Sequence, residues 1–264
     1  MKITMISHCC LLIELGGKQI LTDPWMTEPL YGGRLFHRFG LGLQIEELPP
    51  LDLIVASHGH DDHLDPGTLR RLDPATPVLV LAKVARKVRK LGFSDVFPMA
   101  AGEQYRQGGL WVQACPGKHP GGLVTYVLRG DGETVFFAGD SAYHDGLLEV
   151  GRQFTIDVSL LPVSGGRTFF GKYHFHMNAG ESARVAGTIQ TRVAIPTHYH
   201  FDLRRGPGFL KRSMNMSGKV GEFVQRAAEI CPAVEVVTLG VGQSWSSATT
   251  PEPGIEGESS EDTA

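Results

Sequence analysis

A histidine-rich hexapeptide immediately follows an apolar stretch of this chain. The run Leu51–Ala56 predicts a buried strand, and the segment His58–His63, with the sequence HGHDDH, comes directly after it. Neutral imidazoles and carboxylates are the ligands that zinc and neighbouring divalent ions accept in proteins. A polar surface loop that happens to be rich in histidine is the alternative, but such loops rarely follow a continuous apolar strand. The hexapeptide therefore predicts a metal site at the end of a strand.

The spacing inside the hexapeptide predicts how its ligands divide between two ions. Alternate residues of an extended segment project to the same side, so His58 and His60 can share one ion. Asp62 and His63 come after the point where the chain turns toward the next helix, and they can reach a second ion. We therefore expect two divalent cations.

Composition and charge exclude several classes of protein. The 264 residues, with 42% hydrophobic and 20% charged side chains, suffice for a globular core. The formal charge of −3 arises from an acidic terminal stretch without Lys or Arg, and the near-neutral remainder argues against nucleic-acid binding. The chain shows neither a basic leader with a cleavage site nor an apolar run of membrane-spanning length, and its four cysteines are scattered. We expect a cytoplasmic protein without a transmembrane segment, and its oligomeric state stays open.

Two blocks of strands, each followed by helices, predict the fold class. Strands are expected at Lys2–Ser7, Cys10–Leu15, Lys18–Leu21 and Leu51–Ala56, then several times over 104–138, and at Asp157–Pro162, Val193–Pro196 and Val234–Leu239. Helices are expected at 65–72, 82–91, 178–189 and 219–230. This pattern predicts an α/β protein, an αβ/βα four-layer sandwich of two mixed β-sheets with helices on the outer faces. Residues 1–245 form the predicted domain, and 246–264 form a predicted disordered acidic tail.

Two further segments leave alternatives open. Residues 25–50 have no clear period and are expected to form an irregular loop, whose aromatic residues either line an apolar substrate wall or pack in the core. The helix 82–91 is strongly basic and is either a solvated face or a docking patch. Basic residues after the last strand favour an anionic substrate if they fold over the site, namely Arg204, Arg205, Lys211 and Arg212.

Three later residues follow apolar strands in the way that the hexapeptide does. His119 follows the strand Leu110–Ala114, Asp140 follows Thr134–Ala138, and His198 follows Val193–Pro196. An isolated histidine usually has a structural role, but the repeated placement at strand ends favours metal ligation.

The complete order of these motifs resembles that of the metallo-β-lactamase superfamily of binuclear hydrolases. The matching pieces are HxHxDH, a later lone histidine, Gly-Asp after a strand and a histidine after the last strand. Within the superfamily the chain is similar to the branch of N-acyl phosphatidylethanolamine phospholipase D and L-ascorbate 6-phosphate lactonase-like proteins. That similarity is carried by ISHCCLLIELGGKQILTDPW, ELPPLDLIVASHGHDDH, FAGDSAYHDG, LLPVSG, HMNAGES and IPTHYHFD.

The resemblance implies a division of the ligands and a reaction. One ion is bound by His58, His60 and His119, and the other by Asp62, His63 and His198. Asp140 bridges the two ions, and water between them becomes a nucleophilic hydroxide. The ions are expected to be Zn²⁺, with Mn²⁺ or Fe²⁺ as alternatives, and Asp61 is not in a ligand position.

Other residues are assigned roles around these ligands. In the resembling branch a histidine at the place of His176 lies beside the metals, and we expect His176 to hydrogen-bond the oxyanion or leaving group of the substrate. The alternative is a structural histidine that caps the following helix. Asp23 is expected to anchor backbone or a ligand histidine. His8 is expected to support the ligands or pack near the site, with a direct part in the chemistry as the alternative.

The resulting hypothesis is a dinuclear metal-dependent hydrolase. A bridging hydroxide would attack an ester, lactone or phosphodiester of a small, possibly anionic substrate, with Asp62, Asp140 and His176 as the catalytic residues. One alternative is a metal-binding or ligand-binding module of the same fold that has lost catalysis. A less favoured alternative is a di-iron oxidoreductase, whose HxExD motif differs at His60.

Overall fold

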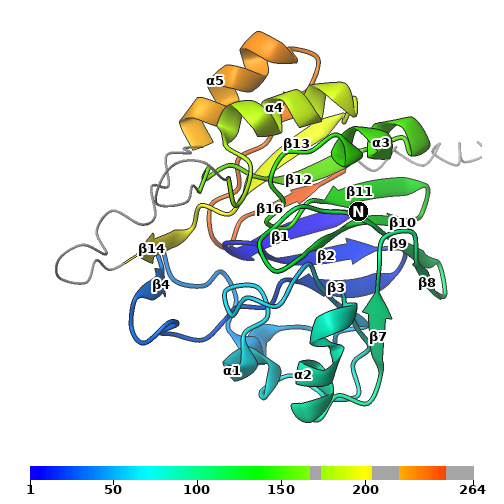
Figure 1. The fold of residues 1–264 in the computed structure, drawn as a ribbon, viewed down its shortest axis with the longest axis vertical. Helices are drawn as coiled ribbons and strands as arrows, with labels where there is room; N and C mark the ends of the chain where they lie inside the picture. Colours follow the sequence, from blue (N-terminus) through cyan, green and yellow to red (C-terminus); the bar gives the residue numbers. More distant parts are fainter. Residues whose placement is uncertain (167–173, 204–219, 248–264) are drawn as a thin grey trace, which may run out of the picture.

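Two seven-stranded β-sheets pack face to face in a computed structural model that describes residues 1–166, 174–203 and 220–247 (Figure 1). The first sheet has the order β16 (Ser244–Ser246), β1 (Lys2–Ser7), β2 (Cys10–Leu15), β3 (Lys18–Thr22), β5 (Leu53–Ala56), β6 (Val78–Leu81) and β7 (Val96–Met99). The second sheet has the order β15 (Glu235–Val236), β13 (Val193–Thr197), β12 (Val158–Pro162), β11 (Glu133–Phe137), β10 (Val124–Gly130), β9 (Leu110–Pro116) and β8 (Gln104–Gln107). Both sheets mix parallel and antiparallel pairs.

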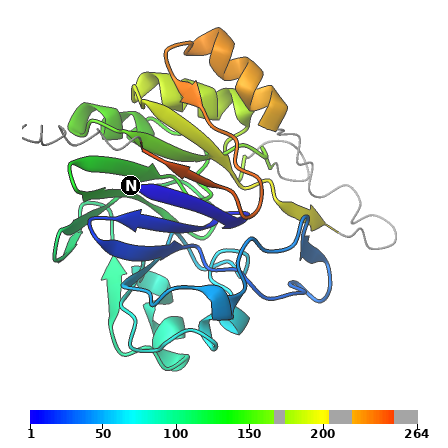
Figure 2. The same ribbon diagram turned by 180° about the vertical axis from the view of Figure 1, so that it is seen from behind.

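Helices cover the outer face of each sheet, as Figures 1 and 2 show from opposite sides. The 3₁₀ helices η1 (Ile45–Glu47) and η2 (Ala82–Val84) and the helices α1 (Pro66–Leu69) and α2 (Ala85–Lys90) lie on the side of the first sheet. The second sheet is covered by α3 (Gly146–Gln153), α4 (Ala179–Thr188) and α5 (Val220–Ile230). Separate apolar clusters fill the space between the sheets and beneath each helical layer. The predicted αβ/βα sandwich is confirmed.

Local signals in the sequence explain several element boundaries. Gly16 and Gly17 have φ angles of 62° and 67°, which suits the tight turn between β2 and β3. The Asp65 carboxylate accepts hydrogen bonds from the backbone of Gly67 and Thr68 and caps α1. Asn178 and Glu181 form the predicted capping box at the start of α4. These caps confirm the predicted helix starts.

Some elements differ from the expectations. The segment 25–50 contains the short strand β4 (Leu35–His37), which pairs with β14 (Phe201–Leu203), and η1. The predicted helix 82–91 begins as the 3₁₀ helix η2 and becomes α-helical only at Ala85. The strands β6, β7 and β16 and the helix α3 were not predicted, because each is too short to show a period of its own.

The strand β16 crosses the expected boundary between residues 245 and 246. Ser246 pairs with Lys2 in the first sheet, and the backbone N–H of Ser247 donates to the carbonyl of Met1 at 3.0 Å. Residues 248–264 of the predicted tail lie outside the described residues. None of the helices in the described part of the chain has the length and apolar character that a membrane crossing requires.

Candidate metal centre

The predicted ligands lie at one end of the two sheets because the strands that precede them run in the same direction. In the first sheet β1 and β5 are parallel, since β1 and β2, and β2 and β3, pair antiparallel and β3 pairs parallel with β5. In the second sheet β9, β11 and β13 are parallel by the same reasoning. The carboxyl ends of these strands therefore meet at one edge, and each is followed by a histidine or aspartate.

Three imidazoles converge at the outer side of this edge. The Nε2 atom of His58 lies 2.9 Å from Nδ1 of His60, and Nε2 of His119 lies 3.2 Å from the same Nδ1. The ligand atoms of the three residues all lie within 4.8 Å of one another. His58 is buried and His60 is exposed, so this triad connects the interior to the surface. The sequence prediction that these residues come together is confirmed.

A second group of ligand atoms lies deeper. Nε2 of His63 is 3.8 Å from Oδ2 of Asp62, and both residues belong with His198 to a group whose ligand atoms lie within 4.8 Å of one another. His63 and His198 are 0% and 2% exposed. This group adds a carboxylate to the imidazoles, which favours a divalent cation.

Asp140 lies between the two groups. Its Oδ1 atom is 3.3 Å from Nε2 of His198, and its Oδ2 atom is 3.9 Å from Nε2 of His63. Together with His58 and His63 it forms a further group of converging ligand atoms. Burial raises the pKa of the Asp140 carboxyl well above its usual value, so this carboxylate needs cations beside it in order to ionise.

The buried atoms of the deeper group lack hydrogen-bond partners. Nε2 of His63, Nε2 of His198 and Oδ1 of Asp140 are all buried and have no hydrogen-bond partner among the described residues. Leaving a buried polar atom unsatisfied costs about 1–3 kcal/mol, and three such atoms rarely face the same space without a shared partner. A bound cation would satisfy all three, so the residues present fit a metal.

Hydrogen bonds on the far side orient the ligand histidines. Nδ1 of His63 lies 2.6 Å from Oδ2 of Asp23, and Nδ1 of His119 lies 2.8 Å from the carbonyl of Phe175. These contacts hold a proton on Nδ1 and leave the Nε2 lone pair facing the centre. Asp23 also accepts from the backbone N–H of Ser57 at 2.6 Å. Asp23 was predicted to anchor backbone or a ligand histidine, and it contacts both the backbone of Ser57 and the ring of His63.

Two supporting residues were not predicted. Oγ of Ser164 lies 2.7 Å from Nδ1 of His198, and Ser164 follows β12, the strand next to β11 and β13. The rule applied to Asp140 and His198, a polar residue after a buried parallel strand, would have found it. The hydroxyl of Tyr31 donates to Oδ1 of Asp62 at 2.7 Å. Tyr31 belongs to the irregular loop, and no pattern pointed to it.

His176 lies beside Asp140, and a backbone hydrogen bond determines which of its ring nitrogens carries the proton. The backbone N–H of Gly166 donates to Nδ1 of His176 at 3.0 Å, so the proton of the neutral ring is on Nε2. Nε2 lies 4.0 Å from Oδ1 of Asp140. Burial lowers the pKa of His176 to about 3, which keeps the ring neutral at physiological pH. The residue therefore presents one N–H donor toward the ligand cluster.

The remaining predicted residues lie as follows. Asp61 pairs with Lys87 of α2 at 2.8 Å and belongs to none of the ligand groups in the described part of the chain. Trp25 is fully buried against His37, so it packs in the core and does not line an open wall. The basic residues predicted after the last strand fall within 204–219, outside the described residues.

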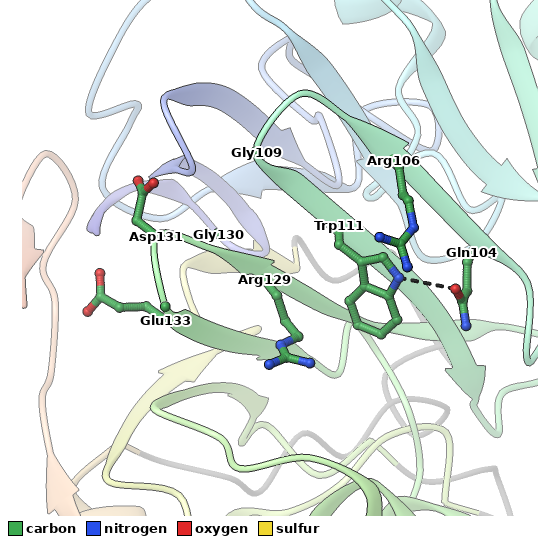
Figure 3. A pocket seen from close by; sticks show the side chains of 9 residues that line it. Gln104, Arg106, Gly109, Trp111, Arg129, Gly130, Asp131 and Glu133 are labelled. Carbon is green, nitrogen blue, oxygen red and sulfur yellow. Dashed lines mark hydrogen bonds between the residues drawn. The ribbon is translucent and has the colours of Figure 1, made fainter.

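A surface hollow of about 430 Å³ lies elsewhere, at the opposite end of the second sheet (Figure 3). Arg106, Trp111 and Arg129 line it, and the turn 130–132 forms one side. This turn precedes β11, whereas Asp140 follows the other end of that strand. The hollow is therefore separate from the ligand cluster.

The buried histidines predict how the stability of the metal-free protein depends on pH. Burial lowers the pKa of His119 and His200 to about 4 and that of His176 to about 3. In the unfolded chain such groups bind protons near pH 6.5. The unfolded state therefore binds more protons than the native state between about pH 4 and 6.5, and stability falls as the pH drops through this window.

His63 makes the stability depend on pH in the opposite direction, because its pKa is raised in the native state. Burial lowers its pKa, but the carboxylates of Asp23, Asp62 and Asp140 outweigh burial and raise the pKa to about 9. Its contribution to stability is complete below about pH 6.5 and is lost as the pH rises toward 9.

We expect the free energy of unfolding of chelator-treated protein to be greatest near neutral pH. On the acid side it should fall by about 1.4 kcal/mol per pH unit for each histidine that stays neutral in the native state. Urea unfolding, followed by tryptophan fluorescence at several pH values, measures this profile. A free energy that does not change between about pH 4.5 and 6.5 contradicts the prediction.

Comparisons with known proteins show the family and the fold of this chain. The family model described as "Beta-lactamase superfamily domain" matches residues 18–199. A UPF0173 metal-dependent hydrolase from Aeropyrum pernix is 28% identical, over 92% of this chain and 96% of its own. The crystal structure of an isothiocyanate hydrolase from Delia radicum gut bacteria has a TM-score of 0.76 at 17% identity, covering 94% of this chain and 99% of the other. CmlA, a diiron β-hydroxylase from Streptomyces venezuelae, has a TM-score of 0.68 at 16% identity, covering 92% of this chain and 53% of the other. At these identities the two structures show a shared fold.

Proposed function

The match to the family model shows that the chain belongs to the beta-lactamase superfamily, and from this premise we propose that it is a dinuclear metal-dependent hydrolase. The main supporting observation is the set of buried atoms on His63, His198 and Asp140 that lack hydrogen-bond partners among the described residues and lie close together beside the triad of His58, His60 and His119. In this proposal one ion is held by His58, His60 and His119, the other by Asp62, His63 and His198, with Asp140 shared.

A pair of bound cations would lower the pKa of a shared water to near 7 and so supply hydroxide at physiological pH. Asp140 contributes the carboxylate that faces both groups of ligands. Asp62 contributes a second carboxylate, oriented by the Tyr31 hydroxyl. The two carboxylates would neutralise only part of the positive charge of two cations. The centre would therefore keep a net positive charge that attracts an anionic substrate.

His176 is proposed to donate a hydrogen bond to the oxyanion or leaving group of the substrate. Its Nε2–H faces the ligand cluster, and its neutral ring gives a donor without a full charge. A further hydrogen bond orients the ring, because Oγ of Ser164 lies 3.2 Å from Nδ1. His176 is 3% exposed, so this donor acts in a site from which water is largely excluded.

We expect His176→Gln to lower kcat by about 10²–10³-fold while the protein retains its metal content. Loss of one oxyanion donor acts on the transition state, so KM should change much less than kcat. Steady-state kinetics with metal analysis of the same preparation measure both. If the His176→Gln variant kept full turnover and full metal content, His176 would have no part in the reaction. It would then have the alternative role, that of a structural residue before α4.

Lys83 supports a substrate that carries a negative charge. Gly59 has no room for a Cβ atom, which would lie 2.4 Å from Cγ1 of Val84, so η2 packs directly on the metal-binding segment. Burial lowers the pKa of His60, and the nearby Lys83 ammonium acts in the same direction. Lys83 is exposed, and within the described residues it has no carboxylate partner, whereas Lys87 pairs with Asp61. A phosphate or carboxylate of the substrate would serve as the partner of the Lys83 ammonium.

The proposed function is tested with purified protein of defined metal content. Metal analysis should find two equivalents per chain of zinc, manganese or iron. A panel of lactones, carboxylic esters, phosphodiesters and β-lactams, each as a neutral and an anionic member, should then show hydrolysis of at least one class and preference for anionic members. Fewer than two equivalents of any metal, or two equivalents without hydrolysis of any class, would favour the non-catalytic binding module.

A further inference from the structure

His8 lies between β1 and β2, beside the deeper group of ligand atoms. Its side chain is 1% exposed, and neither ring nitrogen has a hydrogen-bond partner among the described residues. Its backbone has a φ angle of 52°, in the left-handed region that residues other than glycine rarely occupy. The carbonyl of His8 accepts a hydrogen bond from the backbone N–H of His198 at 3.1 Å, which ties the two loops together. The fold therefore holds His8 with a strained backbone and with a buried imidazole whose nitrogens have no hydrogen-bond partner among the described residues.

Two large aromatic side chains pack against the His8 ring. The centroid of the His8 ring lies 5.4 Å from that of Trp25 and 5.0 Å from that of Phe201, both in edge-to-face contact. Toward the ligand cluster, Nε2 of His8 lies 3.8 Å from Oδ2 of Asp62. The ligand atoms of His8, Asp62, His63 and His198 all lie within 4.8 Å of one another. The polar groups that face the ring are thus those of the deeper metal site.

A structural role explains this arrangement poorly. A phenylalanine or leucine would fill an aromatic pocket without burying two unsatisfied nitrogens, each of which costs about 1–3 kcal/mol. Strained backbone conformations persist mainly where the surroundings impose them, often at ligand sites. Asp23 shows the contrast, because its buried carboxylate has partners on both oxygens. His8 lacks such partners and faces the same cluster as His63 and His198.

We propose that His8 is a further ligand of the second ion, bound through Nε2. This inference rests on the proposed dinuclear function and adds a donor to its deeper site. The second ion would then be held by Asp62, His63, His198 and His8 together with the shared Asp140, one donor more than a four-coordinate zinc ion takes. The first ion keeps four protein donors, from His58, His60, His119 and Asp140. The deeper site is therefore suited to an ion of higher coordination number, such as Mn²⁺ or Fe²⁺.

A crystal structure of the metal-loaded wild-type protein tests the proposal directly. The expected result is an ion at the deeper site with Nε2 of His8 at about 2.0–2.2 Å, the usual distance from imidazole nitrogen to a divalent transition metal. An ion held by Asp62, His63 and His198 with this nitrogen more than about 3 Å away would overturn the inference and leave the proposed function intact. An ion between His58, His60 and His119 alone would overturn both.

Metal affinity of a variant pair gives a second readout. His8→Phe preserves the aromatic packing and removes the donor, and it should weaken binding of the second equivalent of Mn²⁺ in chelator competition by roughly a hundredfold or more. The first equivalent should bind as in wild type. His200→Phe is the matched control, because His200 is also 3% exposed with an unpartnered Nδ1 but belongs to none of the ligand groups in the described part of the chain. Wild-type affinity of His8→Phe for both equivalents would overturn the inference.

Discussion

Asp140→Asn is expected to reduce kcat/KM by about 10³-fold or more. The substitution keeps the shape of the side chain and removes the charge that faces both groups of candidate ligands, so under the proposed function a shared water would no longer be held between two fully bound cations. A loss of this size corresponds to about 4 kcal/mol of transition-state stabilisation. The measurement is steady-state hydrolysis of the best panel substrate, together with the metal content of the variant.

Asp61→Asn is the control for this prediction. Asp61 is a carboxylate of the same hexapeptide region, but it pairs with Lys87 and lies in none of the ligand groups found among the described residues. Its variant should keep near wild-type activity and metal content. Equal losses in both variants would show that general electrostatics near the segment, rather than a shared carboxylate, accounts for the effect.

Asp23→Ala is expected to lower the free energy of unfolding by about 3–5 kcal/mol and the affinity for the second ion by 10–100-fold. Asp23 is 0% exposed and accepts hydrogen bonds from the backbone N–H and hydroxyl of Ser57 and from Nδ1 of His63. Its removal leaves buried donors unpaired and frees the ring of His63 to rotate. Urea unfolding of the metal-free protein measures the first effect, and chelator competition measures the second.

The matched control is Asp145→Ala, at an exposed position before α3 whose side chain makes no capping hydrogen bond. It should change the free energy of unfolding by less than about 0.5 kcal/mol. If Asp23→Ala lost stability without loss of metal affinity, Asp23 would support the fold alone and would not act through His63.

How far the sequence predicted the metal centre depends on the kind of information each residue carries. The hexapeptide could be identified because its ligands are adjacent in the chain and follow a recognisable apolar strand. His119, Asp140 and His198 could be identified because each follows such a strand, although they are distant in sequence. Ser164 obeys the same rule and was missed, because a serine after a strand is too common to attract notice.

Other features depended on distances that a single sequence does not contain. Tyr31 reaches Asp62 from a loop without a period, and Lys83 lies beside His60 because η2 packs on Gly59. The strands β6 and β7 were missed because each has only four residues, and so short an apolar run also fits part of a helix. Of the two alternatives for the loop aromatics, core packing holds for Trp25, and the sequence could not decide between them because the core accepts an aromatic ring as readily as a pocket does.

Patterns in the sequence were sufficient to predict the two-sheet sandwich and a set of candidate ligands, because apolar runs, turns and ligand-type residues alternate along the chain. The folded structure was needed to show which nitrogen of each histidine faces the centre and which buried atoms lack partners. It also decided that His8 joins the deeper group. The physical reason is that tautomer, burial and convergence depend on contacts between strands that are far apart in sequence, and those contacts exist only after both sheets have packed.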